Sequence, residues 1–244
     1  SYPGFAGGDR TDIALPAVQQ RLLEVLHATG KPVVLILTTG SALGVRWAKD
    51  NLPAIVVAWY PGQQGGNAVA DVLFGDTNPA GRLPVTFYES VAQLPSFADY
   101  AMEGRTYRYF RGEPVYPFGH GLSYTRFEYS NLRLSRPDVA AGDPTEVEVT
   151  LKNAGSRAGD EVVQLYVRDV VSARPAAIRS LRGFQRIRLA PGEQRPVRFS
   201  LEPERDFASY DEALKAYAVE PGAFEIEIGA SSADIRARGL VTVR

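Results

Sequence analysis

Residues 32–37 read Pro-Val-Val-Leu-Ile-Leu, and this short apolar run decides how the first half of the chain is organised. The run is rich in β-branched residues and is followed by Thr-Thr-Gly at residues 38–40, a pattern that predicts a strand buried on both faces of a parallel sheet. Residues 54–59, Ala-Ile-Val-Val-Ala-Trp, repeat the pattern. Two such strands predict parallel pairing, with helices packed on the sheet in an α/β arrangement.

A helix is expected before the first strand, between Asp12 and Thr29. Four apolar residues in this segment recur at helical spacing, Pro16 suits an early helical position, and Gly30 supplies the stop. These four residues are Val18, Leu22, Val25 and Leu26.

Two further helices are expected around the second strand, over residues 41–49 and 67–74. Ser41 is the expected N-cap of the first, because a serine oxygen accepts readily from free helix N–H groups. Ser41 does not satisfy the G-x-S-x-G pattern of a nucleophile elbow. The Gly-rich turn at residues 61–66 lacks the lysine and the glycine spacing of phosphate loops, so it is interpreted as a structural turn.

Residues 76–125 lose this periodicity and accumulate Pro, Gly and Tyr, which predicts a long ordered connector with aromatic anchors. Beyond Arg126 the apolar pattern changes to period two, which predicts half-buried antiparallel strands separated by Gly-containing turns. The four clearest segments are residues 146–151, 162–167, 196–201 and 224–228. With no cysteine pair available, an immunoglobulin-like β-sandwich of the fibronectin type III kind fits this pattern.

The composition of the 244 residues excludes several classes of protein. Lys plus Arg number 27 and Asp plus Glu number 28, so the net charge of −1 offers no basic field for nucleic acid. Neither apolar run, residues 32–37 or residues 54–59, is long enough to cross a membrane. Without cysteine and with only His27 and His120, the chain cannot supply a thiolate zinc site or a His-rich metal site.

The segment around Asp9 and Arg10 carries the polar residues that could bind a ligand. Thr11 or Asp12 could cap the first helix, while Asp9 and Arg10 could pair with each other or clamp ligand hydroxyls. His120 lies between two glycines. Its side chain could make a hydrogen bond that holds the loop in place, or it could contact a sugar or a partner, and the structural role is favoured.

Several motifs carry a family resemblance when taken in order. They are GGDRTDI at 7–13, GKPVVLIL at 30–37, AWYPGQQGGN at 58–67, DVLFGD at 71–76, NPAGRLP at 78–84, YPFGHGLSY at 116–124 and LRGF at 181–184. Together they resemble the C-terminal portion of glycoside hydrolase family three, the β-glucosidases and β-xylosidases. RTYRYF at 105–110 resembles the xylosidase branch more than the glucosidase branch.

The resemblance implies a fold and a division into domains. Residues 1–124 are expected to be the C-terminal part of an α/β sandwich domain with its connector, and residues 125–244 a fibronectin type III-like domain. In the family an N-terminal TIM-like barrel precedes these domains and carries the nucleophilic aspartate, and the acid/base glutamate falls upstream of Ser1. No catalytic residue is therefore assigned to this chain, and Asp9 and Arg10 are the expected substrate-binding residues.

The resemblance also implies an activity: retaining, exo-acting hydrolysis of oligosaccharides, with β-xylosidase favoured over β-glucosidase and no metal or organic cofactor. The expected partners are the N-terminal barrel portion of the same enzyme and an oligosaccharide, with neither nucleic acid nor membrane, in a periplasmic or secreted setting. An assembled enzyme predicts a contiguous apolar patch on the α/β part.

The alternative is a carbohydrate-binding or interaction module that acts alone. Its platform would be Trp59, Tyr60 and the aromatic side chains of residues 107–110.

Overall fold

The computed structural model describes residues 5–6, 9–173 and 176–244, with side chains from Arg10 onward. These residues divide into two compact units, which are described separately. The first unit holds residues up to Thr77 with 85–106 and 110–117, and the second holds 78–84, 107–109 and 118–244. The domain boundary between residues 124 and 125 stays a prediction.

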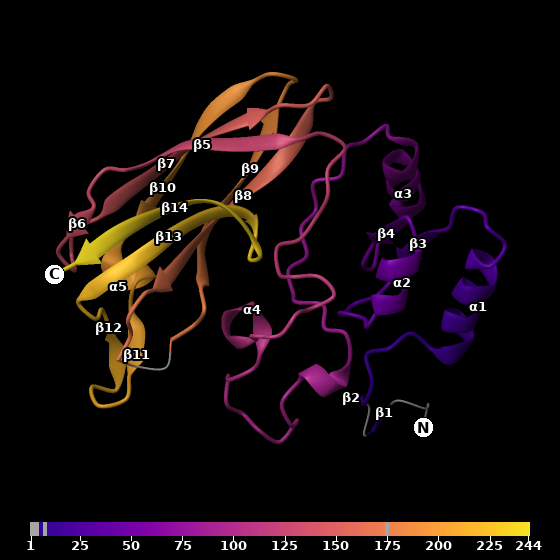
Figure 1. The fold of residues 1–244 in the computed structure, drawn as a ribbon, viewed down its shortest axis with the longest axis horizontal. Coiled ribbons are helices and arrows are strands. Elements are labelled where there is room, and N and C mark those ends of the chain that lie inside the picture. The colour runs from indigo at the N-terminus through magenta and orange to yellow at the C-terminus, as the bar shows by residue number, and fades with distance from the viewer. Residues whose placement is uncertain (1–4, 7–8, 174–175) are drawn as a thin grey trace. The chain divides into compact units, whose positions relative to one another are not determined.

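The first unit is an α/β arrangement around one parallel strand pair (Figure 1). Its elements are β1 (Phe5–Ala6), β2 (Asp9–Arg10), α1 (Ala17–His27), β3 (Val34–Leu37), α2 (Arg46–Asn51), β4 (Ala54–Val57), α3 (Gly65–Phe74) and the 3₁₀-helix η1 (Val91–Gln93). The short helix α4 (Thr106–Tyr109) contains residues of both units. β3 and β4 pair in parallel from Val34 opposite Ala54 to Leu37 opposite Val57. The prediction of parallel strands is confirmed.

The prediction that the first strand is buried on both faces is wrong for the described structure. Val34 and Ile36 project from the same face of β3 and are 42% and 40% exposed, whereas Leu37 on the opposite face is buried. The apolar pattern is typical of a strand that is covered on both faces. Among the residues that the structure describes, only the face that carries Leu37 is covered.

Helix α1 is shorter than predicted and begins at Ala17 rather than near Asp12. Pro16 is the N-cap residue, and a proline disfavours helical geometry in the residue before it. Asp12 Oδ1 instead accepts a hydrogen bond from the Ala14 N–H at 3.0 Å, so neither Thr11 nor Asp12 caps the helix. The helix ends as predicted before Gly30, whose φ is +71°.

The predicted helix over residues 41–49 is also shorter, because α2 begins at Arg46 with Val45 as N-cap. The backbone before Arg46 makes other hydrogen bonds that are incompatible with a helix. The Gly44 N–H donates to the Ile13 carbonyl at 2.8 Å, and Ala14 and Gly44 form a parallel β-bridge. The expected N-cap role of Ser41 is therefore wrong.

The second unit is a β-sandwich made of a five-stranded and a three-stranded sheet (Figure 1). The strand orders are β6-β14-β13-β8-β9 and β10-β7-β5, with β11-β12 as a separate hairpin. Its elements are β5 (Phe127–Leu134), β6 (Asp138–Val139), β7 (Thr145–Asn153), β8 (Gly159–Asp169), β9 (Ser180–Leu189), β10 (Gln194–Leu201), α5 (Pro203–Asp206), β11 (Ser209–Asp211), β12 (Ala216–Ala218), β13 (Gly222–Ser231) and β14 (Asp234–Val243).

The core of this unit follows the predicted alternation. Along β7 every second residue from Thr145 to Asn153 is buried, and Val147, Val149 and Leu151 are completely buried. The inward side chains of both sheets form one apolar cluster, as expected of two sheets packed face to face. All four predicted strands are confirmed.

Two of these strands are more buried than the predicted half-buried pattern. In β8 the five consecutive residues 163–167 are buried, and in β13 the four residues 226–229 are buried. Tyr107 of the connector covers the outer face of β8: its ring stacks on Phe118 at 4.2 Å and meets Tyr166 edge-on at 6.0 Å. Period two therefore identified the strands, but it did not predict that the connector covers the outer face of β8.

No helix among the described residues is long and apolar enough to span a membrane.

Candidate functional site

The polar residues singled out in the first unit gather where the two parallel strands end. Residues 38–41 follow β3 and residues 58–60 follow β4. In open α/β sheets ligands bind at the carboxyl ends of the strands, because the loops there converge at one edge. We name five residues the carboxyl-end group: Arg10, Thr39, Ser41, Trp59 and Tyr60.

Arg10 reaches this edge through a direct side-chain contact. Its Nη1 donates a hydrogen bond to Ser41 Oγ at 2.9 Å. Ser41 is held by a local turn, in which its N–H donates to Thr39 Oγ1 at 3.2 Å and Thr39 Oγ1 donates to the Ser41 carbonyl at 2.9 Å. Arg10 is exposed, so its remaining N–H groups can donate to a ligand oxygen. The side chain of Asp9 lies outside the described residues, and its role stays a prediction.

Tyr60 supplies an aromatic face at the same edge. The ring is 77% exposed and lies against Gly40, where a Cβ atom would approach within 2.6 Å of Tyr60 Cε2. A side chain at position 40 would therefore displace the ring. Trp59, by contrast, has a positive φ of 55° and meets the fully buried Phe87 edge-on at 6.3 Å.

The chemistry of the carboxyl-end group is that of binding rather than bond cleavage. It offers a guanidinium, three hydroxyl groups and an exposed aromatic ring, which can donate to hydroxyl oxygens and cover an apolar ring face. The group contains no carboxylate that could act as a nucleophile or general acid. Among the described residues there is also no cluster of three or more His, Cys, Asp or Glu side chains suited to a metal ion.

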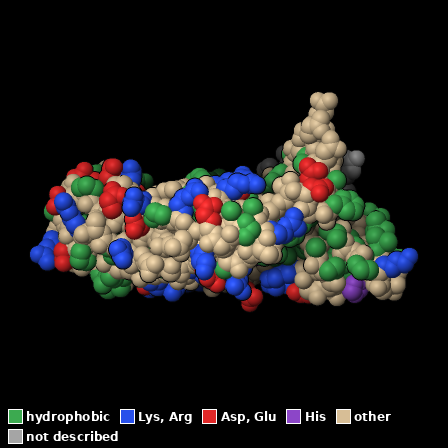
Figure 2. Space-filling view, turned by 90° about the horizontal axis from the view of Figure 1, so that it is seen from above, with side chains coloured by type: hydrophobic (Ala, Val, Ile, Leu, Met, Phe, Trp, Pro, Cys, Tyr) green, Lys and Arg blue, Asp and Glu red, His purple; other side chains and the backbone are tan. Residues whose placement is uncertain are grey.

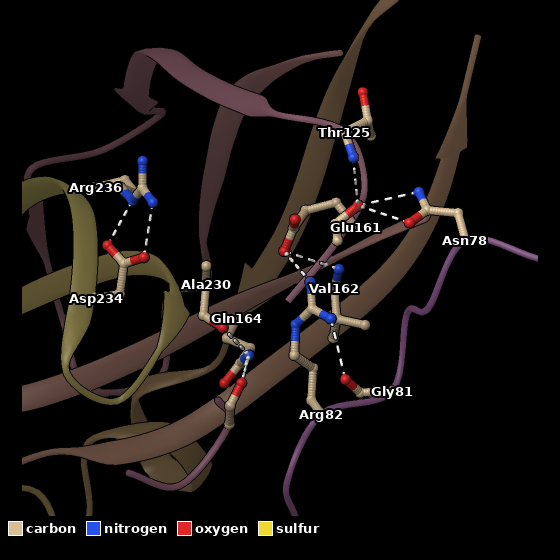
Figure 3. Close-up of polar contacts among 12 residues, drawn as sticks. Asn78, Gly81, Arg82, Thr125, Glu161, Val162, Gln164, Ala230, Asp234 and Arg236 are labelled. Atoms are coloured by element: carbon tan, nitrogen blue, oxygen red, sulfur yellow. Dashed lines mark hydrogen bonds and ion pairs between the residues drawn. The ribbon is translucent and has the colours of Figure 1, made fainter. Parts of the chain in front are cut away.

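A second polar cluster, in the other unit, was not predicted from the sequence as a site. Arg82 of the NPAGRLP motif lies beside Glu161 of β8, and Nη2 donates to Oε1 at 3.0 Å, with both side chains more than nine-tenths buried (Figure 3). The Val162 N–H donates to the same carboxylate at 3.1 Å. Burial raises the pKa of Glu161 against the opposing effect of Arg82, and burial also raises the pKa of Tyr129.

The other end of this motif is fixed by Asn78. Its Nδ2 donates to Ser123 Oγ at 3.0 Å, and its Oδ1 accepts from the Tyr124 N–H at 2.7 Å. Further along, the Leu83 N–H donates to the His120 carbonyl at 2.8 Å. This contact fits the favoured structural role of His120, although it uses the backbone rather than the imidazole.

The glycines on either side of His120 are required by close packing. Gly119 has a φ of +80°, and a Cβ atom there would collide with Gln164 Oε1. A Cβ atom at Gly121 would collide with the Gly81 carbonyl oxygen. The two motifs around Asn78 and His120 are therefore parts of one buried anchor on β8. In the sequence these motifs show no hydrophobic periodicity, and their polar and glycine residues were the only sign of the anchor.

The aromatic platform of the alternative hypothesis is only partly available. Tyr107 is engaged in packing, and its Oη accepts from the Leu181 N–H at 3.0 Å. Phe110 meets Tyr88 edge-on at 5.0 Å. The aromatic run 107–110 therefore packs within the structure, because its rings are needed to order the connector, and Tyr60 is the exposed member of the proposed platform.

Comparison with known proteins identifies two family domains along the chain. Residues 4–124 match the glycosyl hydrolase family 3 C-terminal domain, and residues 161–232 match the fibronectin type III-like domain. A xylan 1,4-β-xylosidase of Xylanibacter ruminicola is 43% identical over 95% of this chain and 26% of its own length. A periplasmic β-glucosidase of Salmonella typhimurium is 39% identical over 93% of this chain and 31% of its own length.

Solved structures show the same relationship. A β-glucosidase from Erythrobacter marinus superposes with a TM-score of 0.86 at 42% identity, covering 100% of this chain and 32% of that chain. A family 3 β-glucosidase from Bifidobacterium adolescentis gives 0.88 at 32% identity, over 98% of this chain and 37% of that one. The chain spans about a third or less of the length of the xylosidase and the periplasmic glucosidase that it matches. With both domains present in the same order, this chain belongs to glycoside hydrolase family three.

Proposed function

We propose that this chain is the C-terminal part of a retaining, exo-acting β-glycosidase that hydrolyses oligosaccharides, with β-xylosidase favoured over β-glucosidase. The two-domain match to the family carries the proposal. Two relatives named as xylosidases are 43% identical to the chain, against 39% for the Salmonella β-glucosidase. A solved β-glucosidase at 42% identity lies close behind, so the preference for xylose also rests on the RTYRYF segment.

In this proposal the chain positions substrate, and the principal catalytic carboxylates lie in the part of the polypeptide outside it. Retaining hydrolysis uses one carboxylate as nucleophile and a second as acid and then base, with a glycosyl–enzyme intermediate that water resolves. Arg10 and Tyr60 would line one wall of the sugar site. The guanidinium would hold substrate hydroxyls, and the aromatic ring would cover an apolar sugar face.

The exposed apolar surface of the first unit supports a larger assembly. Val18 and Leu22 of α1 are 77% and 57% exposed, and Phe74 at the end of α3 is 84% exposed. Figure 2 shows apolar side chains gathered on one region of the surface. Large contiguous apolar patches mark interaction surfaces. The expected occupant is the preceding part of the same polypeptide, which would cover this face.

The first test is a denaturing intact-mass spectrum of the native protein, followed by hydrolysis assays. We expect either one longer polypeptide that contains this chain or an equimolar larger partner. That protein should hydrolyse an aryl β-xyloside faster than the matched aryl β-glucoside, and proton NMR should show the β-anomer as the first product. A native species of only 26.6 kDa would contradict the proposal, and the α-anomer as first product would contradict a retaining mechanism.

The exposed ring of Tyr60 favours a second candidate, a carbohydrate-binding module without catalysis. Titration calorimetry of the isolated chain with xylo- and cello-oligosaccharides distinguishes it. Binding that is lost in Tyr60→Ala, in a protein with no hydrolytic activity, would favour the module. No heat at millimolar sugar would exclude it.

A periplasmic or secreted location is also proposed, and it is supported by the Salmonella relative, which is named as a periplasmic β-glucosidase. Fractionation of source cells into periplasm, medium and cytoplasm, followed by detection with an antibody to this chain, would test it. Recovery only in the cytoplasm would contradict it.

A further inference from the structure

One loop of the first unit holds two aromatic side chains almost completely in water. In the segment 95–105, Phe97 is 86% exposed and Tyr100 is 90% exposed, and the nearby Met102 is 47% exposed. Exposed apolar side chains are common singly, but a cluster of large ones marks a site of interaction.

This segment is nevertheless held in one shape by the side chain of Arg105. Its Nε donates to the Ala101 carbonyl at 3.1 Å, and its Nη2 donates to the carbonyls of Ser96 at 2.9 Å and Asp99 at 2.5 Å. One guanidinium thus satisfies three backbone acceptors in the loop. Charge-assisted hydrogen bonds of this kind are about twice as strong as neutral ones.

Further contacts fix the turn and the base of the same segment. The Asp99 N–H donates to the Ser96 carbonyl at 3.0 Å, and Asp99 Oδ1 accepts from the Ala101 N–H at 2.8 Å. At the base the Thr106 N–H donates to Tyr88 Oη at 2.7 Å. We name residues 95–105 the Arg105 loop. Its conformation is ordered before any partner binds, which lowers the entropy cost of association.

The chemistry of the loop tip indicates the kind of surface that it fits. The side chains of Asp99 and Arg105 bond to the loop backbone, whereas the phenyl, phenol and thioether side chains are exposed to water, and Glu103 beside Met102 is an exposed charged residue of the loop. Aromatic and Met side chains are enriched in the centres of protein interfaces, where charged residues are depleted. A sugar would instead require free polar groups around the rings to bind its hydroxyls. The composition therefore favours an apolar recess on a protein.

We propose that the Arg105 loop inserts Phe97 and Tyr100 into an apolar recess on the part of the same polypeptide that lies outside this chain. This inference rests on the proposed function, in which that part supplies the catalytic carboxylates. The chain covers only 26% to 32% of the two relatives named as xylosidases at 43% identity, so most of the surface of such a protein comes from the remaining residues. The two rings would then be anchors of the assembly.

The test measures burial of the loop directly. This chain has no cysteine, so Tyr100→Cys introduces the one thiol of its 244 residues, on a peptide that mass spectrometry identifies, and Phe97→Cys repeats the measurement at the second ring. Phe184→Cys on β9, where the native side chain is 67% exposed, is the matched control. Each variant is made in the complete polypeptide, and alkylation by iodoacetamide is followed by peptide mass spectrometry in native and urea-denatured protein.

We expect the thiols introduced at positions 97 and 100 to react at least about tenfold more slowly in the native than in the denatured protein, which corresponds to about 1.4 kcal/mol, while the control changes little. Equal rates in the native and denatured forms would overturn the proposal. Protection that disappears on dilution would also overturn it, because the occupant would then be a second copy. Protection in a protein that lacks glycosidase activity would retain the loop inference and reject the proposed function.

Discussion

Arg82 and Glu161 form an ion pair at 3.0 Å across 79 residues of sequence, and their side chains are only 8% and 5% exposed. This pair attaches the NPAGRLP segment to β8. Because an isolated charge is very costly to bury, each residue depends on the other. The pair therefore explains why a segment without secondary structure is held in one place.

Removal of Arg82 should destabilise the protein strongly. In Arg82→Ala the Glu161 carboxylate stays buried without its main cation, and breaking a buried pair from one side costs about 3–5 kcal/mol. Urea unfolding followed by near-ultraviolet circular dichroism would measure the loss in the free energy of unfolding. The control is Arg198→Ala, which breaks the Arg198–Glu148 pair at 2.6 Å, where the arginine is 68% exposed, and should cost less than about 1 kcal/mol. Equal losses in the two variants would contradict the prediction.

The stability of the protein should show an unusual dependence on pH. Burial raises the folded-state pKa of Glu161 above the usual value of 4.5, so the folded protein binds the proton at pH values where the unfolded chain has released it. The contribution of this group to the free energy of unfolding is therefore largest below pH 4.5 and decreases as the pH rises through the folded pKa. Wild type should lose stability relative to Glu161→Gln over this window.

Urea midpoints measured from about pH 4 to pH 7.5 would check this sign. Glu193→Gln is the control, because a hydrogen bond from the Ala190 N–H lowers the pKa of the exposed Glu193. Its contribution should be lost only as the pH falls through that lowered pKa. A wild-type advantage over Glu161→Gln that grows with pH would show that the pair with Arg82 outweighs burial.

Two glycine substitutions should change stability in opposite directions. Gly121→Ala places a Cβ atom against the Gly81 carbonyl oxygen, and such overpacking costs about 1–3 kcal/mol. Gly66→Ala lies in α3, where nothing is within 4 Å of the new Cβ atom, and removing a helical glycine should gain about 0.5–1 kcal/mol. Thermal unfolding by calorimetry would measure both. If Gly121→Ala left the thermal stability unchanged, the buried anchor on β8 would be able to shift and make room for the new Cβ atom.

Arg10→Ala should weaken substrate binding in the complete enzyme without unfolding it. Arg10 is exposed and contacts Ser41, so its loss should raise KM by about tenfold, or about 1.4 kcal/mol, and leave Tm unchanged. Arg126→Ala, where the native side chain is 74% exposed beside Glu128, is the control for a surface charge. Steady-state kinetics on an aryl glycoside would decide, and an unchanged KM in Arg10→Ala would remove Arg10 from the sugar site.

Four strands of the second unit, β7, β8, β10 and β13, could be predicted from the sequence alone, because their apolar residues recur with period two. In β7 the buried residues Val147, Val149 and Leu151 are also every second residue in the sequence. Helix starts were predicted less well. Backbone contacts from Ile13 to Gly44 displaced the start of α2, and no local propensity reports a contact across 31 residues.

Local periodicity and contiguous motifs were enough to predict the parallel pairing of β3 with β4, four strands of the second unit and the family. Only the tertiary structure decided that Arg10 meets Ser41, that Arg82 is neutralised by Glu161, and that Arg105 orders a loop with two exposed rings. The physical reason is that burial, charge pairing and steric fit depend on which distant residues come together, and the linear pattern does not contain those distances.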